Sequence, residues 1–222
     1  MRALPGGGSR VAAARVTIPA EPQTPVMSDD HHAHDADQIG FGVLTVTTSR
    51  TLETDDSGDA IVAGIEDEGH TVAVRDLVAD DERAIRQRVE ELTDREDVDA
   101  VVTSGGTGLT PDDVTPEAVR PLFDRSVPGF GEQFRAKSVE DVGPHGMLTR
   151  ATAGIADGVA VFCLPGSEQA AAFGMTELIA PVVAHVVGLA GGGGHGHHHD
   201  DDGHDHHDHD NHEHDHDHGG HE

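Results

Sequence analysis

Residues 101–114 read VVTSGGTGLTPDDV and are followed directly by TPE at 115–117. Two apolar residues lead into a polar turn with three glycines, and a pair of aspartates, Asp112 and Asp113, precedes the start of a helix. This order predicts a strand, a glycine loop, an acidic pair and a helix that begins with proline. Glycines let the backbone turn sharply and approach a ligand closely, and free N–H groups at such a turn attract anions. The stretch therefore predicts an α/β unit with a site for an anionic ligand.

The acidic pair suggests how an anion would be held. Asp112 and Asp113 are suited to Mg²⁺ beside phosphate groups, because Mg²⁺ favours one or two carboxylates together with substrate oxygens. The stretch lacks the Gly-Lys-Ser/Thr ending of a P-loop, and Lys137 is the only lysine of the chain. Backbone amides and a metal ion would therefore have to bind any nucleotide phosphates.

Strands and helices alternate along the rest of the folded part. Apolar runs predict strands, and helical spacing of apolar residues predicts helices. The predicted strands are 41–47, 71–74, 98–103 and 159–164, and the predicted helices are 60–68, 82–93, 130–139 and one or two over 168–189. Continuously apolar strands alternating with helices favour an α/β fold, a mostly parallel sheet with helices on both faces. Ligands of such sheets bind at the carboxyl ends of the strands, so the loops 47–58, 104–113 and 165–167 are expected to converge on one crevice.

The composition is strongly acidic. The 222 residues carry a formal charge of −28, and residues 40–190 contain 27 Asp and Glu against 11 Lys and Arg. This balance is typical of proteins from high-salt cytoplasms and argues against a nucleic-acid partner, which needs a basic face. Cys163, the single cysteine, is expected in the core. No signal peptide is seen, and the apolar run 178–190 is too short to span a bilayer, so we expect a cytoplasmic protein without a membrane partner.

Both ends of the chain differ from the folded part. Residues 1–39 are rich in Gly, Pro, Ala and Ser and are expected to be disordered, with Met27 a possible true start. Residues 191–222 contain 13 His and 10 acidic residues but no Lys or Arg. Such a tail is expected to be disordered and to bind Zn²⁺, Ni²⁺ or Cu²⁺ weakly, and the cluster His31, His32 and His34 resembles it. The alternative is a solvated acidic extension without a metal.

Five motifs occur in the order and spacing of a known family. They are DDSG (55–58), SGGTGLTPDDVTPEA (104–118), PGFGEQFR (128–135), LTRATAGI (148–155) and LPGS (164–167). Over about residues 40–190 the chain resembles the MoaB/MogA group of molybdenum-cofactor biosynthesis proteins. The resemblance implies a single α/β domain that assembles as a homotrimer or hexamer. It also implies that AMP is transferred from Mg-ATP to molybdopterin, and that the product passes to a molybdate- or tungstate-insertion protein.

The resemblance also implies a set of site residues. Asp113 corresponds to the acidic residue linked to catalysis, and Asp80 to a second functional aspartate, although the adjacent Asp81 and Glu82 leave the register uncertain by one. Both aspartates would hold Mg²⁺. The residues expected to contact the pterin or the nucleotide are Ser57, Gly58, Ser104, Gly105, Gly106, Thr107, Gly108, Asp112, Glu132, Pro165, Gly166 and Ser167. Thr149 directly precedes Arg150, at a position where the family commonly has serine. Apart from the resemblance, Arg135 or Arg150 is a candidate to neutralise the anionic substrate, because arginine offers bidentate donors.

Several alternatives remain open at this point. Asp113 has a structural explanation as a helix-capping carboxylate, Glu132 as a surface residue, and Arg135 and Arg150 as ion-pair partners. The chain itself is alternatively a non-catalytic molybdopterin-binding scaffold of the same fold, or a metal-buffering protein that acts through its tail. Neither the choice between molybdenum and tungsten nor the oligomeric state follows from the residues.

Overall fold

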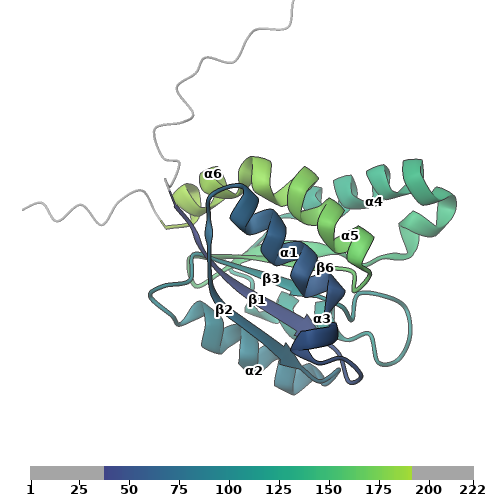
Figure 1. Cartoon of the computed structure of the whole chain (residues 1–222), viewed down its shortest axis with the longest axis horizontal. Helices are drawn as coiled ribbons and strands as arrows, with labels where there is room; N and C mark the ends of the chain where they lie inside the picture. The colour runs from purple at the N-terminus through teal and green to yellow at the C-terminus, as the bar shows by residue number, and fades with distance from the viewer. Residues whose placement is uncertain (1–37, 192–222) are drawn as a thin grey trace, which may run out of the picture. The chain divides into compact units, whose positions relative to one another are not determined.

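One sheet of six strands forms the centre of this computed structural model, which describes residues 38–191 (Figure 1). Its order is β2-β1-β3-β6-β5-β4, with the bounds β1 (Gly40–Val46), β2 (Thr71–Val78), β3 (Ala100–Ser104), β4 (Arg125–Ser126), β5 (Thr152–Ala156) and β6 (Val159–Leu164). The first four strands of this order are parallel, whereas β5 is antiparallel to β6 and β4 is antiparallel to β5. This confirms the predicted mostly parallel α/β sheet.

Helices cover both faces of the sheet, as predicted. They are α1 (Asp56–Asp67), α2 (Glu82–Thr93), α3 (Thr115–Val119), α4 (Pro128–Val142), α5 (Glu168–Phe173) and α6 (Ala180–Ala190). A π-helical stretch, Gly174–Ile179, joins α5 to α6, so that one helix continues from residue 168 to residue 190. Figure 1 shows α1, α4, α5 and α6 on one face and α2 on the other, and buried residues of α3 pack with those of α2.

The central strands are buried on both faces. Along β1, Phe41 and Val43 belong to the apolar cluster under α1 and the 168–190 helix, whereas Leu44 and Val46 belong to the cluster under α2 and α3. This alternation explains why β1, β3 and β6 are continuously apolar in sequence. Cys163 lies in the second cluster, as predicted, and burial raises the pKa of its thiol to about 11.

The antiparallel strands β4 and β5 were not predicted. β5 and β6 form a hairpin around Asp157 and Gly158, whose φ angles are +49° and +79°. Asp-Gly between two apolar runs is the sequence signal for such a tight turn, because both positions need a positive φ. The signal was present in the sequence, but the run TAGIA of β5 is short and its small residues weaken its strand character.

The start of α1 differs from the prediction in a way that affects the site. The helix begins at Asp56 rather than at residue 60, because the carboxylate of Asp55 caps it and accepts the N–H of Gly58 at 3.0 Å. Ser57 and Gly58, predicted as part of a ligand-facing loop, are therefore buried in the first helical turn.

The helix at 168–190 is long and apolar enough, by length and composition alone, to cross a membrane. The membrane-length argument considered only residues 178–190, whereas the one or two helices predicted over 168–189 are joined by the π-helical stretch into one longer helix. Met175, Ile179 and Val183 are buried at helical spacing against the sheet, which is the arrangement of a core helix. The membrane test is therefore weak evidence here. Ile39, which the prediction placed in the disordered N-terminus, is instead fully buried in the core. Residues 1–37, the possible start at Met27 and the histidine tail from residue 192 lie outside the described residues.

Candidate functional site

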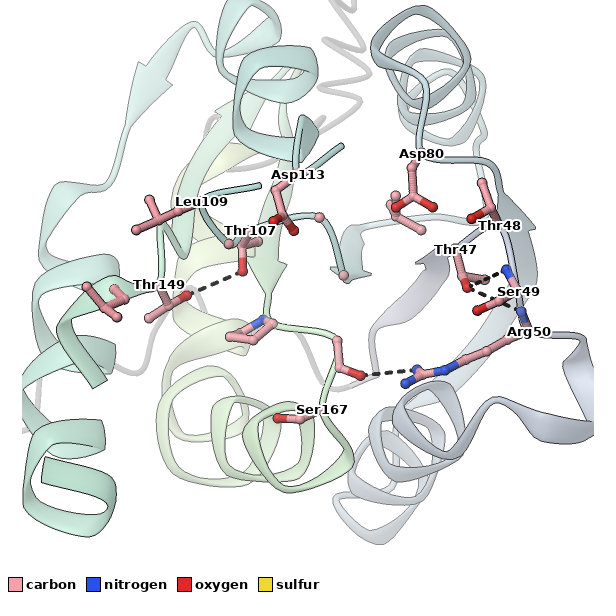
Figure 2. Close-up of a pocket in the computed structure, with 17 residues that line it drawn as sticks. Thr47, Thr48, Ser49, Arg50, Asp80, Thr107, Leu109, Asp113, Thr149 and Ser167 are labelled. Atoms are coloured by element: carbon pink, nitrogen blue, oxygen red, sulfur yellow. Dashed lines mark hydrogen bonds between the residues drawn. The ribbon is translucent and has the colours of Figure 1, made fainter. Parts of the chain in front are cut away.

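A cleft of about 620 Å³ opens at the carboxyl ends of the parallel strands (Figure 2). The loops after β1, β3 and β6 meet there, as the sequence predicts, and Asp80 joins them from the connection between β2 and α2. The residues that line it are Val46, Thr47, Thr48, Ser49, Arg50, Asp80, Gly105, Gly106, Thr107, Gly108, Leu109, Asp113, Leu148, Thr149, Pro165, Gly166 and Ser167. Seven of the cofactor-binding residues expected from sequence, together with both expected catalytic aspartates, are among them.

Two glycines give the loop after β3 its shape. Gly105 and Gly106 have φ angles of +103° and +66°, which disfavour residues with a side chain. A Cβ atom on Gly105 would overlap the carbonyl oxygen of Val46, so the loop passes directly against the end of β1. Thr115 fixes it from below, because its hydroxyl donates to the carbonyl of Gly105 at 2.8 Å and its N–H donates to that of Gly106 at 3.0 Å. The loop is thus held in one conformation before any ligand arrives.

Asp113 points into the cleft from the end of this loop (Figure 2). Its Oδ2 atom accepts the N–H of Thr110 at 2.8 Å and the hydroxyl of Thr110 at 2.7 Å. Partial burial opposes ionisation, but these bonds, a bond from the Gly108 N–H and the charge of Arg150 outweigh it and lower the pKa of Asp113. The carboxylate is therefore ionised at neutral pH and available to a cation. Gly108 leaves room for it, since a Cβ there would be 2.7 Å from Oδ2.

Asp80 is the second acidic residue of the cleft, and its two acidic neighbours are engaged elsewhere. The neighbouring Asp81 caps α2 by accepting the N–H of Ala84 at 2.8 Å, and Glu82 pairs with Arg86 at 2.7 Å. Of these three acidic residues only Asp80 lines the cleft, where Figure 2 shows its carboxylate across from that of Asp113.

The two carboxylates fit Mg²⁺ in a complex with substrate. Within residues 38–191 no group of three or more His, Cys, Asp or Glu side chains is arranged to hold a metal by itself. Asp80 and Asp113 would fill only part of the coordination shell of one ion. Mg²⁺ commonly completes its shell with water and phosphate oxygens. The donor set therefore suits a metal that arrives with a phosphorylated substrate rather than a permanently bound one.

The β6 loop forms the facing wall of the cleft. The Ser104 hydroxyl donates to the carbonyl of Pro165 at 3.3 Å, so the buried Ser104 joins two loops and does not line the cleft. Gly166 packs against the glycine loop, since a Cβ there would be 3.1 Å from Cα of Gly105. The hydroxyls of Thr107 and Thr149 lie 3.3 Å apart, and Figure 2 shows this pair on the wall of the cleft.

The remaining predicted residues lie elsewhere. Ser57 and Gly58 are buried in the first turn of α1 and Asp112 is exposed, and none of the three lines the cleft. Glu132 is exposed on α4 and lines a separate hollow together with Arg135. None of these four predicted ligand-binding residues lines the cleft. The prediction was wrong for them because the motifs do not reveal the helix cap at Asp55 or the directions of α3 and α4.

Arg135 and Arg150 bind the backbone rather than the cleft. Arg135 donates to the carbonyls of Thr149 and Ala151 at 3.4 and 3.3 Å. Arg150 donates to the carbonyl of Gly108 at 2.7 Å and also contacts the Asp113 carbonyl and the Glu117 carboxylate. The predicted alternative of an ion-pair partner therefore holds for Arg150, which clamps the loop that carries Asp113, whereas Arg135 is held by backbone carbonyls instead.

Arg50 is a cleft residue that the sequence analysis did not identify. It ends the loop after β1, where its guanidinium donates to the Ser57 hydroxyl at 2.9 Å and to the Gly166 carbonyl at 3.1 Å. Figure 2 shows Arg50 reaching toward the loop that carries Ser167. Leu109 and Leu148, with 66% and 48% exposure, form an apolar rim that was missed as well. The run TTSR at 47–50 directly after a buried strand was the available signal for Arg50.

Asp55 supports this wall from the core. The side chain is fully buried, accepts the hydroxyl of Thr45 at 2.6 Å and pairs with Arg75 at 3.2 Å. Burial raises its pKa, but hydrogen bonds from Thr45, Gly58, Arg75 and Ser57 prevail, and the pKa of Asp55 is lowered.

This lowered pKa predicts a loss of stability in acid. A depressed carboxylate pKa stabilises the fold above the unfolded value of about 4, and this contribution disappears as the pH falls through the folded pKa. Asp55→Asn is expected to lower the free energy of unfolding at pH 7 by about 2–3 kcal/mol, the range for hydrogen bonds to a charged group. It should also flatten the decline of stability below pH 4. Urea unfolding from pH 7 to pH 3 measures both, and an unchanged slope in the variant would refute the assignment.

Comparisons with known proteins agree on one family. A family model described as a probable molybdopterin binding domain matches residues 42–185. Molybdenum cofactor biosynthesis protein B of Bacillus subtilis is 43% identical over 163 residues, covering 72% of this chain and 96% of the relative. Its counterpart in Escherichia coli K12 is 41% identical, covering 64% of this chain and 83% of the relative. Among solved structures, the tungsten cofactor synthesizing protein MoaB from Pyrococcus furiosus has a TM-score of 0.60 at 38% identity, covering 70% of this chain and 99% of that structure.

Proposed function

This chain belongs to the family of probable molybdopterin-binding domains, with molybdenum cofactor biosynthesis protein B among its relatives, and from that premise we propose that it adenylylates molybdopterin. Biosynthesis of the molybdenum cofactor is the function that the family membership supports. The finer proposal is that AMP passes from Mg-ATP to the phosphate of molybdopterin, with pyrophosphate as the second product. A tungsten cofactor is the equivalent product where tungsten is used, as in the name of the Pyrococcus relative.

One observation carries the proposal: Asp80 and Asp113 face one cleft that is otherwise lined by a glycine loop and hydroxyl side chains. Transfer of AMP needs a place for a triphosphate with its metal and for a second phosphate beside it. A pterin-binding scaffold has no comparable need for two carboxylates, which repel an anionic ligand in the absence of a metal.

The proposed reaction requires the protein to position the two substrates, and it requires no general base. An anionic phosphate oxygen of molybdopterin attacks the α-phosphorus of ATP, and the bond from that phosphorus to the bridging oxygen of pyrophosphate breaks. Pyrophosphate leaves with the electron pair, and no proton has to be removed. Asp80 and Asp113 would hold Mg²⁺, which supplies charge neutralisation on the phosphate oxygens when bound. The amides of Gly106 to Gly108 and the Thr107 hydroxyl would orient the phosphates.

The test is formation of adenylylated molybdopterin and release of pyrophosphate from molybdopterin and Mg-ATP in high-salt buffer. Product that depends on both substrates and on Mg²⁺ is expected. Folded protein that binds molybdopterin but forms no product would favour the non-catalytic scaffold instead. A chain ending at Gly191 is expected to match the full chain, and loss of activity without the histidine tail would assign the tail a direct role.

We further propose that the chain assembles as a homotrimer or hexamer. An apolar groove of about 270 Å³ lies between the start of α4, strands β5 and β6 and the 168–190 helix, lined by residues such as Phe130, Leu178 and Val182. Val182 is 44% exposed, and an open apolar groove is typical of a protein–protein interface.

The oligomer is tested by light scattering of the wild type and of Val182→Asp. The wild type is expected at three or six times the 23.3 kDa of one chain. A charge buried in an apolar interface is unfavourable, so Val182→Asp should shift the mass toward one chain. A monomeric wild type at micromolar concentration would refute the proposal.

A further inference from the structure

Arg50 is the single lysine or arginine among the described residues that line the cleft. Its side chain is 37% exposed and reaches across from the loop after β1 to the loop after β6. Figure 2 shows it at the end of the cleft near Ser167, whereas the carboxylates of Asp80 and Asp113 lie toward the other end. The positive charge of Arg50 and the negative charges of Asp80 and Asp113 therefore lie at different ends of the cleft.

The guanidinium is held in place from one side only. Its Nη1 atom donates to the Ser57 hydroxyl and to the Gly166 carbonyl, and the buried Asp55 carboxylate lies 3.8 Å from the same atom. Within residues 38–191 of the structure, neither Nη2 nor Nε donates a hydrogen bond. Asp55 is itself shared with Arg75 at 3.2 Å, so it neutralises Arg50 only in part. The N–H groups of these two nitrogens thus remain for a ligand on a planar, preoriented group, the geometry that favours a phosphate.

The loop before Arg50 is held in place by hydrogen bonds of its own. The Thr47 hydroxyl accepts the N–H groups of Ser49 and Arg50 at 3.2 and 3.3 Å, which forms a tight turn at the end of β1. Thr48 and Ser49 also line the cleft, and Figure 2 shows Thr48 nearer to Asp80 than to the guanidinium. The turn therefore fixes the backbone from which the Arg50 side chain extends along the cleft.

We propose that Arg50 binds the terminal phosphate monoester of molybdopterin, an assignment that rests on the proposed adenylyl transfer. The reaction brings a phosphate monoester against a triphosphate, and the two anions repel each other. Mg²⁺ at Asp80 and Asp113 would neutralise the triphosphate, which leaves the attacking monoester without a counter-charge unless Arg50 provides it. Ser57 then acts indirectly, since it positions Arg50 and does not touch the ligand.

Arg50→Gln removes the charge and keeps an amide that can donate to Gly166. Arg95→Gln is the matched control, because Arg95 pairs with Asp97 at 2.8 Å in the loop that precedes β3, at the opposite ends of the strands from the cleft, and the change in net charge is the same. Binding is titrated with molybdopterin, with the same pterin after enzymatic removal of its phosphate, and with Mg-ATP.

Arg50→Gln is expected to weaken binding of phosphorylated molybdopterin roughly 10- to 100-fold, the range for a charge-assisted hydrogen bond, and to leave Mg-ATP within about twofold. Wild type and Arg50→Gln should bind the dephosphorylated pterin equally, and Arg95→Gln should match wild type throughout. Equal losses for both pterin forms would show that Arg50 only ties two loops together. A loss confined to Mg-ATP would assign the guanidinium to the nucleotide, and no loss would remove it from the site; each overturns the proposal.

These titrations need no turnover, so they separate the two proposals. Protein that shows the phosphate-dependent loss but forms no adenylylated product would keep Arg50 as a phosphate-binding residue while the transferase proposal fails. Product formation with no effect of Arg50→Gln on pterin binding would support the transferase proposal and overturn the assignment of Arg50.

Discussion

Replacement of Asp113 by alanine is expected to reduce adenylyl transfer about 10³-fold while the protein stays folded. The reason is that this carboxylate is one of two available to a metal in the cleft, and loss of metal-based charge neutralisation costs several kcal/mol in the transition state, where about 1.4 kcal/mol is a factor of ten. The fold should survive because the side chain bonds only to Thr110 and Gly108 of the same loop, outside the apolar core.

Asp112→Ala is the matched control for this prediction. Asp112 carries the same charge at the neighbouring position, but it is exposed and does not line the cleft. Turnover at saturating Mg²⁺, with unfolding curves for both variants, measures the difference. A similar loss in both variants, or none in Asp113→Ala, would show that the acidic pair acts only through its overall charge.

Replacement of Gly105 by alanine is expected to destabilise the protein by about 3–5 kcal/mol and to abolish molybdopterin binding. The backbone at Gly105 has a φ of +103°, and a Cβ there would overlap the Val46 carbonyl oxygen at the end of β1. Backbone strain of about 1–3 kcal/mol and overpacking of similar size add at this position. The loop can escape only by moving away from β1, which also displaces the cleft wall formed with Gly166.

Gly129→Ala separates this effect from a general intolerance of alanine. Gly129 lies in the first turn of α4, and a Cβ there meets nothing within 4 Å. Its replacement is expected to leave stability unchanged or to raise it by up to about 1 kcal/mol, because alanine favours helix. Urea unfolding of both variants in high salt is the measurement. Equal stability of Gly105→Ala and wild type would mean that the loop is not held against β1 as the structure shows.

Local signals in the sequence predicted much of the fold. The spacing of Ile85, Val89 and Leu92 defined α2 with the bounds that the structure has, Glu82–Thr93, because these side chains form one buried stripe. The apolar runs of β1, β3 and β6 likewise predicted a sheet covered on both faces. The hairpin at Asp157 and Gly158 was missed although its turn signal was present, since the strand before it is short and built of small residues.

The sequence by itself determined the α/β class, the convergence of three loops on one cleft and, through the family motifs, the aspartates Asp80 and Asp113. These features follow from residues near one another in the chain or from motifs with fixed spacing. Only the tertiary structure decided that Asp55 and Ser57 are buried and do not line the cleft, that Arg150 clamps the glycine loop, and that Arg50 is the cation inside. Each of these depends on a partner that is distant in sequence or hidden by a cap. The bond from Arg50 to Gly166, for example, joins residues 116 positions apart, and packing of the strands in the order β1-β3-β6 is what brings them together.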